Sequence, residues 1–435
     1  MALCITIAIL TALSMTCAVI IKPYVSVGKF KLGLYWLICL AGAVLMLALG
    51  CVSLETVWSG ITANTSVNPI KILTLFISMT LLSIYLGDAG FFDYVADRVF
   101  LKSKGGQLKL FLILYAVVSV LTVFTSNDII ILTFTPPICI FAKRAKISPL
   151  PFLFGEFIAA NTWSMMLIVG NPTNIYLAQS MGISFANYFS VMWLPTVAGG
   201  LVSLAVLLLI FKKQLSKPIF REQTKINAYT PKVVKIPMLV TVAHLLICIV
   251  ALAFADLLQI EMWIICLSLT LSMTIFKIVY DFIVVNSICP VLNTLKKAPF
   301  ELIPFVLSMF VIVLALKENS VTDVLSNLLV GKTQADGVSF GFLSALSANL
   351  LNNIPMSVLF EKIISGASMP AIYGAIIGSN VGAFITPVGA LAGIMWSKIL
   401  AKYDIKMPFN KFLLYGSAVA IPTLTASALS LLLIF

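Results

Sequence analysis

The chain has 435 residues, of which 61% are hydrophobic and only 10% are charged, and its mean hydropathy is +1.10. Soluble globular proteins carry about 25% charged residues, so this composition excludes a soluble enzyme, a disordered chain and a nucleic-acid-binding protein. The net charge of +12 could suggest an acidic partner, but the placement of the basic residues, described below, explains it better. The sequence predicts a polytopic membrane protein.

The first apolar segment, residues 1–21, has no Lys or Arg before Lys22. It therefore lacks the positively charged region with which a signal peptide begins, and we expect it to be the first spanning helix. The eight cysteines lie singly in or beside apolar runs, and none forms a CxxC pair. The sequence thus predicts neither a disulfide framework nor a metal site.

Spanning helices need about 20 apolar residues. Runs of about this length are 3–21, 32–52, 70–87, 188–211, 236–255, 260–280, 300–316 and 410–434. Two other apolar regions, 107–142 and 338–364, carry polar residues at their middle, which predicts re-entrant hairpins. Two more, 152–183 and 370–399, are interrupted by Gly, Pro, Asn and Thr, which predicts broken helices. The expected fold is all-α, with about ten full spans and two re-entrant hairpins.

Basic residues mark the cytoplasmic connections of membrane proteins. With the N-terminus outside and the hairpins not crossing the bilayer, 24 of the 28 Lys and Arg lie in inside connections. The four that lie outside are Lys71, Lys317, Lys332 and Lys362, and the acidic connection from Asp256 to Glu261 also falls outside. The inside connections are about 22–31, 88–109, 143–149, 212–235, 277–299 and 398–411. The net charge is therefore a topology signal, and we expect both termini outside.

The two halves of the chain repeat one pattern. At an offset of 230 residues, Ser78 matches Ser308, Met79 matches Met309 and Asp93 matches Asp323. Each half then continues with a polar-tipped hairpin, a Pro-broken helix and a last helix. Five crossings is an odd number, so the second half must enter the membrane inverted. We expect a first repeat at 1–211, a basic cytoplasmic linker at 212–235 and a second repeat at 236–435, which is typical of secondary transporters with a site near the midplane.

Polar residues gather at the two hairpin tips and the two breaks, and these are the candidate binding residues. They are Ser126, Asn127 and Asp128 at the first tip, Asn161, Gly170, Asn171, Pro172, Thr173 and Asn174 in the first broken helix, Asn352, Asn353 and Pro355 at the second tip, and Ser379, Asn380, Thr386, Pro387 and Gly389 in the second broken helix. Pro and Gly unwind a helix locally. Freed carbonyls can bind a small cation, whereas half-helix N-termini can bind an anion or a polar neutral solute. Routine helix kinks explain one such motif, but four in symmetric order favour a central pocket.

Among the titratable residues, Asp128 is the most informative. A carboxylate at the centre of a span costs about 2.5–3.5 kcal/mol on insertion scales. The functional interpretation is a protonatable coupling group or a cation ligand, and the structural one is a helix cap. Glu156 is interpreted as interfacial or structural, and His244, the only histidine, as a packing residue. No HExxH, GxSxG or Walker motif is present, so the sequence does not indicate an enzyme.

These motifs resemble those of the ion transporter superfamily, most closely the bacterial arsenite/antimonite efflux permeases. The matching stretches are DAGFFDYVADRV (88–99), SNDIIILTFTPPI (126–138), FIAANTWSMMLIVGNPTNI (157–175), LLNNIPMSVL (350–359) and IIGSNVGAFITPVGALAGIMW (376–396). The resemblance implies alternating-access efflux of trivalent arsenic or antimony hydroxides, driven by an ion gradient across the bacterial inner membrane. It implies no cofactor beyond a coupling ion, Na⁺ or H⁺. It also makes a homodimer and a partner ATPase candidates for the assembly.

Other substrates stay open. Residues 170–174 are similar to the Gly-Thr-Pro-x-Asn motif of sodium-coupled dicarboxylate and sulfate carriers, and Asn161 and Asn380 stand where some arsenite permeases have Asp. The alternatives are therefore sodium- or proton-coupled transport of a small anion, such as sulfate or a dicarboxylate, and sodium/proton antiport with Asp128 as the exchanging carboxylate. A passive channel would not need paired inverted breaks.

Overall fold

The computed structural model describes residues 1–21, 24–27, 30–65, 68–102, 106–219, 233–329, 335–364 and 366–435. These residues are mainly helical, with one short antiparallel hairpin of β1 (Tyr24–Val27) and β2 (Phe30–Gly33), which the sequence did not predict. Residues 220–232 of the predicted linker and the predicted outside residue Lys332 lie outside the described ranges.

The helices of the first half begin and end close to the predicted segments. They are α1 (Ala2–Ile21), α2 (Leu34–Ala48), α3 (Leu54–Thr62), α4 (Pro69–Asp88), α5 (Phe91–Lys102), α6 (Gln107–Phe124), α7 (Asn127–Ala145), α8 (Leu150–Trp163), α9 (Pro172–Ser180), α10 (Phe185–Ile210) and α11 (Lys212–Leu215). Side-chain caps begin several of them. Asn68, for example, accepts hydrogen bonds from the first N–H groups of α4, as residues of this type do at helix starts.

The second half follows the same order. Its helices are α12 (Lys235–Ala253), α13 (Ala255–Leu258), α14 (Met262–Val285), α15 (Cys289–Leu295), α16 (Leu302–Glu318), α17 (Val321–Leu329), α18 (Asp336–Leu351), α19 (Asn353–Ile363), α20 (Met369–Val381), α21 (Leu391–Lys402) and α22 (Phe409–Ser430). Both predicted hairpin regions contain two helices joined by a short turn, and both predicted broken helices are interrupted near their middle.

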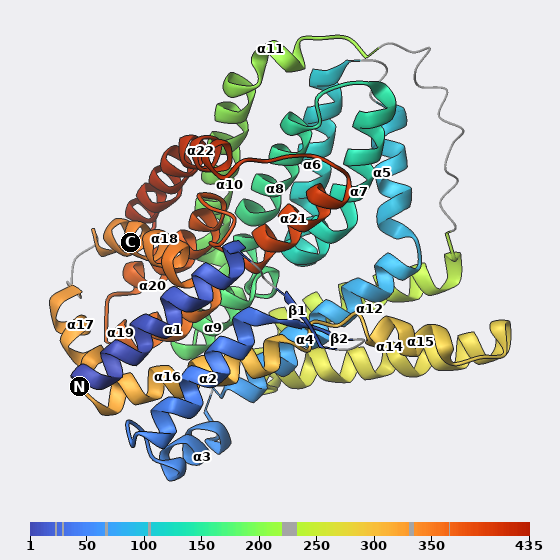
Figure 1. Cartoon of the computed structure of the whole chain (residues 1–435). Helices are drawn as coiled ribbons and strands as arrows, with labels where there is room; N and C mark the ends of the chain where they lie inside the picture. Colours follow the sequence, from blue (N-terminus) through green and yellow to red (C-terminus); the bar gives the residue numbers. More distant parts are fainter. Residues whose placement is uncertain are drawn as a thin grey trace.

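Equivalent helices of the two halves pack on equivalent partners. Helix α2 contacts α16 while α14 contacts α4, α6 contacts α8 while α18 contacts α20, and α7 contacts α21 while α19 contacts α9. Figure 1 shows α2, α4, α14 and α16 in one layer, with α6 to α10 and α18 to α22 beside it. The halves therefore interlock, and one cluster of buried apolar side chains runs through both.

Ion pairs between distant segments join connections that the charge pattern places on the same side. Lys71, at the start of α4, lies 2.6 Å from Glu261, which precedes α14, and both are predicted outside. Lys297 pairs with Asp88 at the end of α4, and both are predicted inside. The grouping of connections into two faces thus agrees with the fold.

Six described helices are long and apolar enough to cross a bilayer, namely α4, α6, α10, α12, α14 and α22. Helices α16 and α17, which meet at a bend of 74°, add a seventh if they form one span. Helix α2, with 15 residues, is only about 22 Å long at 1.5 Å per residue, short of the roughly 30 Å hydrocarbon core. The chain is therefore a multi-pass membrane protein, and length and apolarity alone identify fewer spans than the ten expected.

Candidate functional site

The first hairpin tip lies between α6 and α7 and is tied to the first broken helix. Ser126 is the N-cap of α7, where its Oγ accepts a hydrogen bond from the N–H of Ile129 at 3.4 Å. The Asn127 amide donates through Nδ2 to Oδ1 of Asn161 on α8 at 3.0 Å, and its Oδ1 accepts from the N–H of Asp128 at 2.9 Å. The tip and α8 are thus joined by the predicted polar residues.

Asp128 lies in the first turn of α7 and is partly exposed. Because Ser126 occupies the cap, the carboxylate is not the capping group that the structural interpretation predicted. Among the described residues, no hydrogen-bond donor or cation pairs with this carboxylate. Asp128 is therefore available to an ion or a substrate.

The first break consists of two 3₁₀ turns, Ser164–Met166 and Ile168–Gly170, between α8 and α9. A Cβ atom on Gly170 would collide with the backbone carbonyl of Ser164, so this position requires glycine. Asn171 then caps α9 by accepting a hydrogen bond from the N–H of Thr173 at 3.2 Å, with Pro172 at the first helical position. Each motif residue thus has a local reason to be here.

The second hairpin tip is tied to the second break in a different way. Asn352 has φ +76° and ψ +151°, and its Oδ1 accepts from the N–H of Ile354 at 3.3 Å at the start of α19. Its Nδ2 donates to the carbonyl of Val388 at 2.9 Å, and the N–H of Asn353 donates to the carbonyl of Gly389 at 3.0 Å. Pro355, inside the first turn of α19, is buried and makes no bond across this contact.

One polar residue at this contact was not among the candidates. Asn349, in the last turn of α18, accepts from both the N–H and the Oγ1 of Thr386, at 3.0 and 2.7 Å. Its Nδ2 donates to the carbonyl of Gly382 at 2.8 Å. The sequence placed Asn349 only at the turn of the hairpin. An Asn that is followed three residues later by the Asn-Asn pair was the available signal.

The two breaks meet directly, across the boundary between the halves. Asn380, near the end of α20, accepts hydrogen bonds from Ser164 Oγ at 3.1 Å and from Asn171 Nδ2 at 2.9 Å. Its own Nδ2 donates to Asn174 Oδ1 at 2.7 Å. Asn174 in turn donates to the backbone carbonyl of Ser164 at 2.9 Å. This group of side chains satisfies backbone that the break leaves without helical partners, as membrane-depth backbone requires.

Burial divides the candidate residues into two classes. The amides of the contact between the breaks are buried, as are the hydroxyls of Thr173 and Ser379, which lie 3.0 Å apart. Asp128, Pro172, Thr386 and Pro387 are partly exposed. The buried class therefore holds the breaks in place, and the partly exposed class is free to meet a solute.

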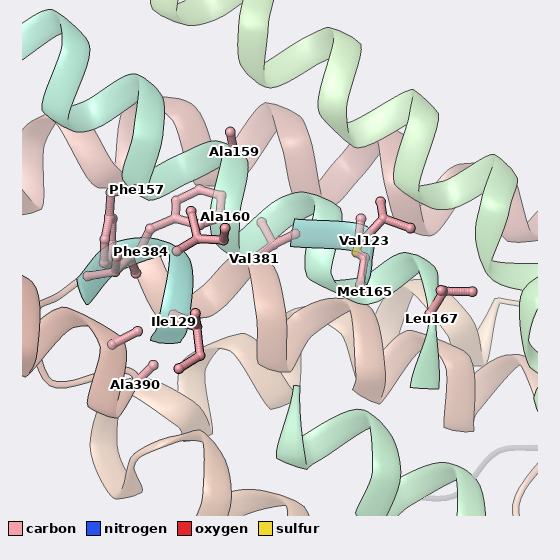
Figure 2. Packing of buried hydrophobic residues seen from close by; sticks show 14 of the residues in the cluster. Val123, Ile129, Phe157, Ala159, Ala160, Met165, Leu167, Val381, Phe384 and Ala390 are labelled. Carbon is pink, nitrogen blue, oxygen red and sulfur yellow. The ribbon is translucent and has the colours of Figure 1, made fainter. Parts of the chain in front are cut away.

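Apolar side chains surround these contacts. Figure 2 shows Phe157 of α8 and Phe384 of the second break in the same cluster as Ile129 and Ala390. All four are almost fully buried. Unpaired polar groups in such surroundings are costly, so the amide and hydroxyl contacts around them stabilise one arrangement of the breaks.

The chemistry at the tips and breaks is that of amides and hydroxyls. Residues 126–128, 161–174, 352–355 and 379–389 contain no Lys, Arg, His or Cys, and their only charged residue is Asp128. No group of three or more His, Cys, Asp or Glu able to hold a metal occurs in the described part of the chain. These residues therefore supply neutral hydrogen-bond donors and acceptors, with one carboxylate among them.

Comparisons with known proteins agree with this description. The sequence model of the CitMHS citrate transporter family matches residues 16–372. The chain is 26% identical over 418 residues to an arsenical pump membrane protein of Escherichia coli, covering 92% of this chain and 94% of that one. It is 26% identical over 400 residues to a putative arsenical pump membrane protein of Bacillus subtilis (strain 168), covering 86% and 88%.

A solved structure shares the fold. The YdaH transporter of Alcanivorax borkumensis superposes with a TM-score of 0.55 at 12% identity, covering 99% of this chain and 97% of that one. Together with the helical architecture, these relatives confirm a membrane transporter rather than an enzyme. The chain thus belongs to the CitMHS citrate transporter family, within the ion transporter superfamily that its motifs predicted.

Proposed function

We propose that this transporter exports trivalent arsenic and antimony hydroxides by alternating access, driven by an ion gradient. The observation that carries the proposal is the absence of Lys and Arg from the tips and breaks, at residues 126–128, 161–174, 352–355 and 379–389. An uncharged trihydroxide offers three O–H groups, which amides and hydroxyls can match. A citrate or sulfate anion is better matched by cationic donors. The arsenical pump relatives, similar over nearly the whole chain, support the same choice.

Alternating access rests on the repeat. We propose residues 1–211 and 236–435 as inverted repeats joined by the linker 212–235. The support is that a helix of one repeat and its equivalent in the other repeat contact equivalent helices. The buried contact of Asn380 with Asn171 and Asn174 would keep the two breaks together as one unit. The partly exposed Asp128 and Thr386 would contact the solute.

Coupling is assigned to Asp128. A partly exposed carboxylate without a fixed cation can exchange a proton with water as its surroundings change. The coupling ion is therefore H⁺ in this proposal, and Na⁺ is the alternative, with the carboxylate as one ligand. The inner membrane location, the outside termini, a homodimer and a partner ATPase stay predictions that rest on the charge pattern and the resemblance.

A second candidate is a small anion. The N-termini of α7 and α9 both lie at the tip and break contacts, and helix N-termini favour anions. The family to which the chain belongs is named for citrate. This reading requires the backbone N–H groups alone to compensate the anion.

Uptake into proteoliposomes separates the candidates. Vesicles with an imposed pH gradient, and others with a sodium gradient, are offered arsenite, antimonite, citrate or sulfate. We expect arsenite and antimonite to accumulate with the pH gradient only. Accumulation of citrate or sulfate without any arsenite flux would refute the proposal, and acceleration of flux by substrate on the opposite side would exclude a channel.

A further inference from the structure

A second carboxylate, outside the proposed binding residues, lies in the interior. Glu156, interpreted from the sequence as interfacial or structural, is fully buried on α8, with 0% of its surface exposed. Its Oε1 accepts a hydrogen bond from Thr135 Oγ1 of α7 at 3.0 Å. Its Oε2 has no hydrogen-bond partner among the described residues. None of the ion pairs in the described part of the chain includes it.

The second half of the chain supplies the other polar neighbour. The indole Nε1 of Trp396, on α21, approaches Glu156 without completing a hydrogen bond, and it too is buried without a partner. The indole ring packs against Phe154 and Phe157, with ring centroids 5.7 and 5.1 Å away. Glu156 therefore lies between α7, α8 and α21 in aromatic surroundings.

This environment suits a neutral acid. Thr135 and Trp396 are uncharged, and an ionised carboxylate without a cation is costly in an apolar interior. The titratable groups on the two neighbouring helices are Asp128, Cys139, Lys143 and Arg144 of α7 and Lys398 and Lys402 of α21. Of these, the Cys139 thiol lies within electrostatic range of Glu156. No ion pair among the described residues joins any of them to Glu156.

Glu156 also lies along α8 between Asn161 and the end of the helix that is predicted inside. It precedes Asn161 by five residues on α8, which is about 7.5 Å at 1.5 Å per residue. It follows the start of α8 at Leu150 by six residues, about 9 Å. Beyond Leu150 lies the basic connection 143–149, which is predicted inside.

We propose that Glu156 is a second proton-binding site of the transporter. The carboxyl is protonated while α7, α8 and α21 pack as they do here. It loses its proton to water, as carboxylate and hydronium, when the other conformation separates Trp396 from it. This inference rests on the proposed gradient-driven transport for its role in coupling, but the protonated state itself can be tested without transport.

The second half contains a matched control. Asn353 of α19 is the counterpart of Asn127 at the first tip, and Glu361 follows Asn353 by eight residues, as Thr135 follows Asn127. Glu361 is also buried, with 6% exposed, but Lys362 lies 2.8 Å from its Oε2. The carboxylate of Glu361 is therefore compensated, and that of Glu156 is not.

The test combines infrared spectroscopy and transport on the full chain in lipid. At neutral pH, we expect a carbonyl band of a protonated carboxyl that is lost in Glu156→Gln and kept in Glu361→Gln. In proteoliposomes, Glu156→Gln should keep arsenite counterflow but lose accumulation driven by the pH gradient, and Glu156→Asp should restore accumulation.

Several outcomes overturn the proposal. It is wrong if the band persists in Glu156→Gln, or if that variant accumulates arsenite as the parent does. Should Glu156→Gln not fold, Thr135→Val serves instead, because loss of its hydrogen bond must shift the band, and an unshifted band refutes the site. If the parent protein moves no arsenite while the band behaves as expected, the proposed function fails and the proton site stands.

Discussion

The contact between the two breaks gives the sharpest stability prediction, through the substitution Asn380→Ala. Asn380 makes three hydrogen bonds to the other half, with Ser164, Asn171 and Asn174. Ser164 can still donate to the carbonyl of Asn161. The substitution therefore leaves two buried side-chain amides, those of Asn171 and Asn174, each short of one hydrogen-bond partner. Each unsatisfied group costs about 1–3 kcal/mol, although side-chain bonds inside membranes average about 0.6 kcal/mol.

We therefore expect Asn380→Ala to destabilise the fold by roughly 2–4 kcal/mol, between these two scales. The matched control is Asn161→Ala. Both amides donate to the carbonyl four residues earlier, at 2.8 Å for Asn161 and 2.9 Å for Asn380, but Asn161 otherwise bonds only to Asn127 of its own half. Asn161→Ala leaves only the Asn127 amide without a partner, so we expect about half the loss of folding free energy.

Thermal unfolding of the purified protein in detergent measures both variants under one condition. Full unfolding of a chain of this length would shift the midpoint by about 1 °C per kcal/mol, and partial unfolding would shift it by more. A double variant of Asn380 and Asn171 should be less destabilised than the sum of the two single variants, because they share one bond. If Asn380→Ala is no worse than Asn161→Ala, the two breaks are not held together by this contact.

Three further predictions use single positions. Gly170→Ala should abolish folding or transport, because its Cβ would meet backbone, whereas Gly106→Ala, with its nearest neighbour at 3.8 Å, should leave expression and transport unchanged. Asp128→Asn should change the pH dependence of arsenite flux, because it removes one of the two proposed proton sites, and an unchanged pH profile would exclude a proton role for Asp128. Lys71 holds the pKa of the Glu261 carboxyl below its usual value, so this pair stabilises the fold at neutral pH and the stabilisation is lost as the pH falls through that pKa. Since about half of the Glu261 side chain is exposed, Glu261→Gln should cost only about 0–1 kcal/mol at neutral pH and nothing in acid, as measured by unfolding at low salt.

The positions of the tips and breaks could be predicted because their causes are local. Pro172 begins a helix and Gly170 permits a close approach of backbone, and such residues act wherever they occur. The apolar runs predicted the helices for the same reason. The charge pattern also predicted Lys71 and Glu261 on the same side of the membrane, and the two residues form an ion pair. This prediction depends on the charges of whole connections and not on contacts between distant residues.

The partners of each polar residue could not be predicted, because they come from distant segments. Nothing near Glu156 in the chain indicates that α21 will cover it with Trp396. Equally, the spacing did not show that Asn349 would bond to Thr386, 37 residues later. From the sequence alone, Glu156, nearly two turns into α8, could lie at the membrane interface or in the protein core. Its environment is set by the helices that pack on it, and these are distant in the sequence.

The two halves share a fold but not a chemistry, and the difference bears on mechanism. Asp128 follows Asn127 at the first tip, whereas Ile354 follows Asn353 at the second. The uncompensated buried acid, Glu156, also belongs to the first half. An inverted repeat lets the same packing be exchanged between two conformations, so symmetric contacts alone would treat both membrane faces alike. Asp128 and Glu156 both belong to the first half and have no such counterpart among the tip residues of the second, so they break this equivalence. The asymmetry of the acids, set in a symmetric frame, would therefore let proton binding favour one of the two conformations, while the ion gradient sets the direction of net transport.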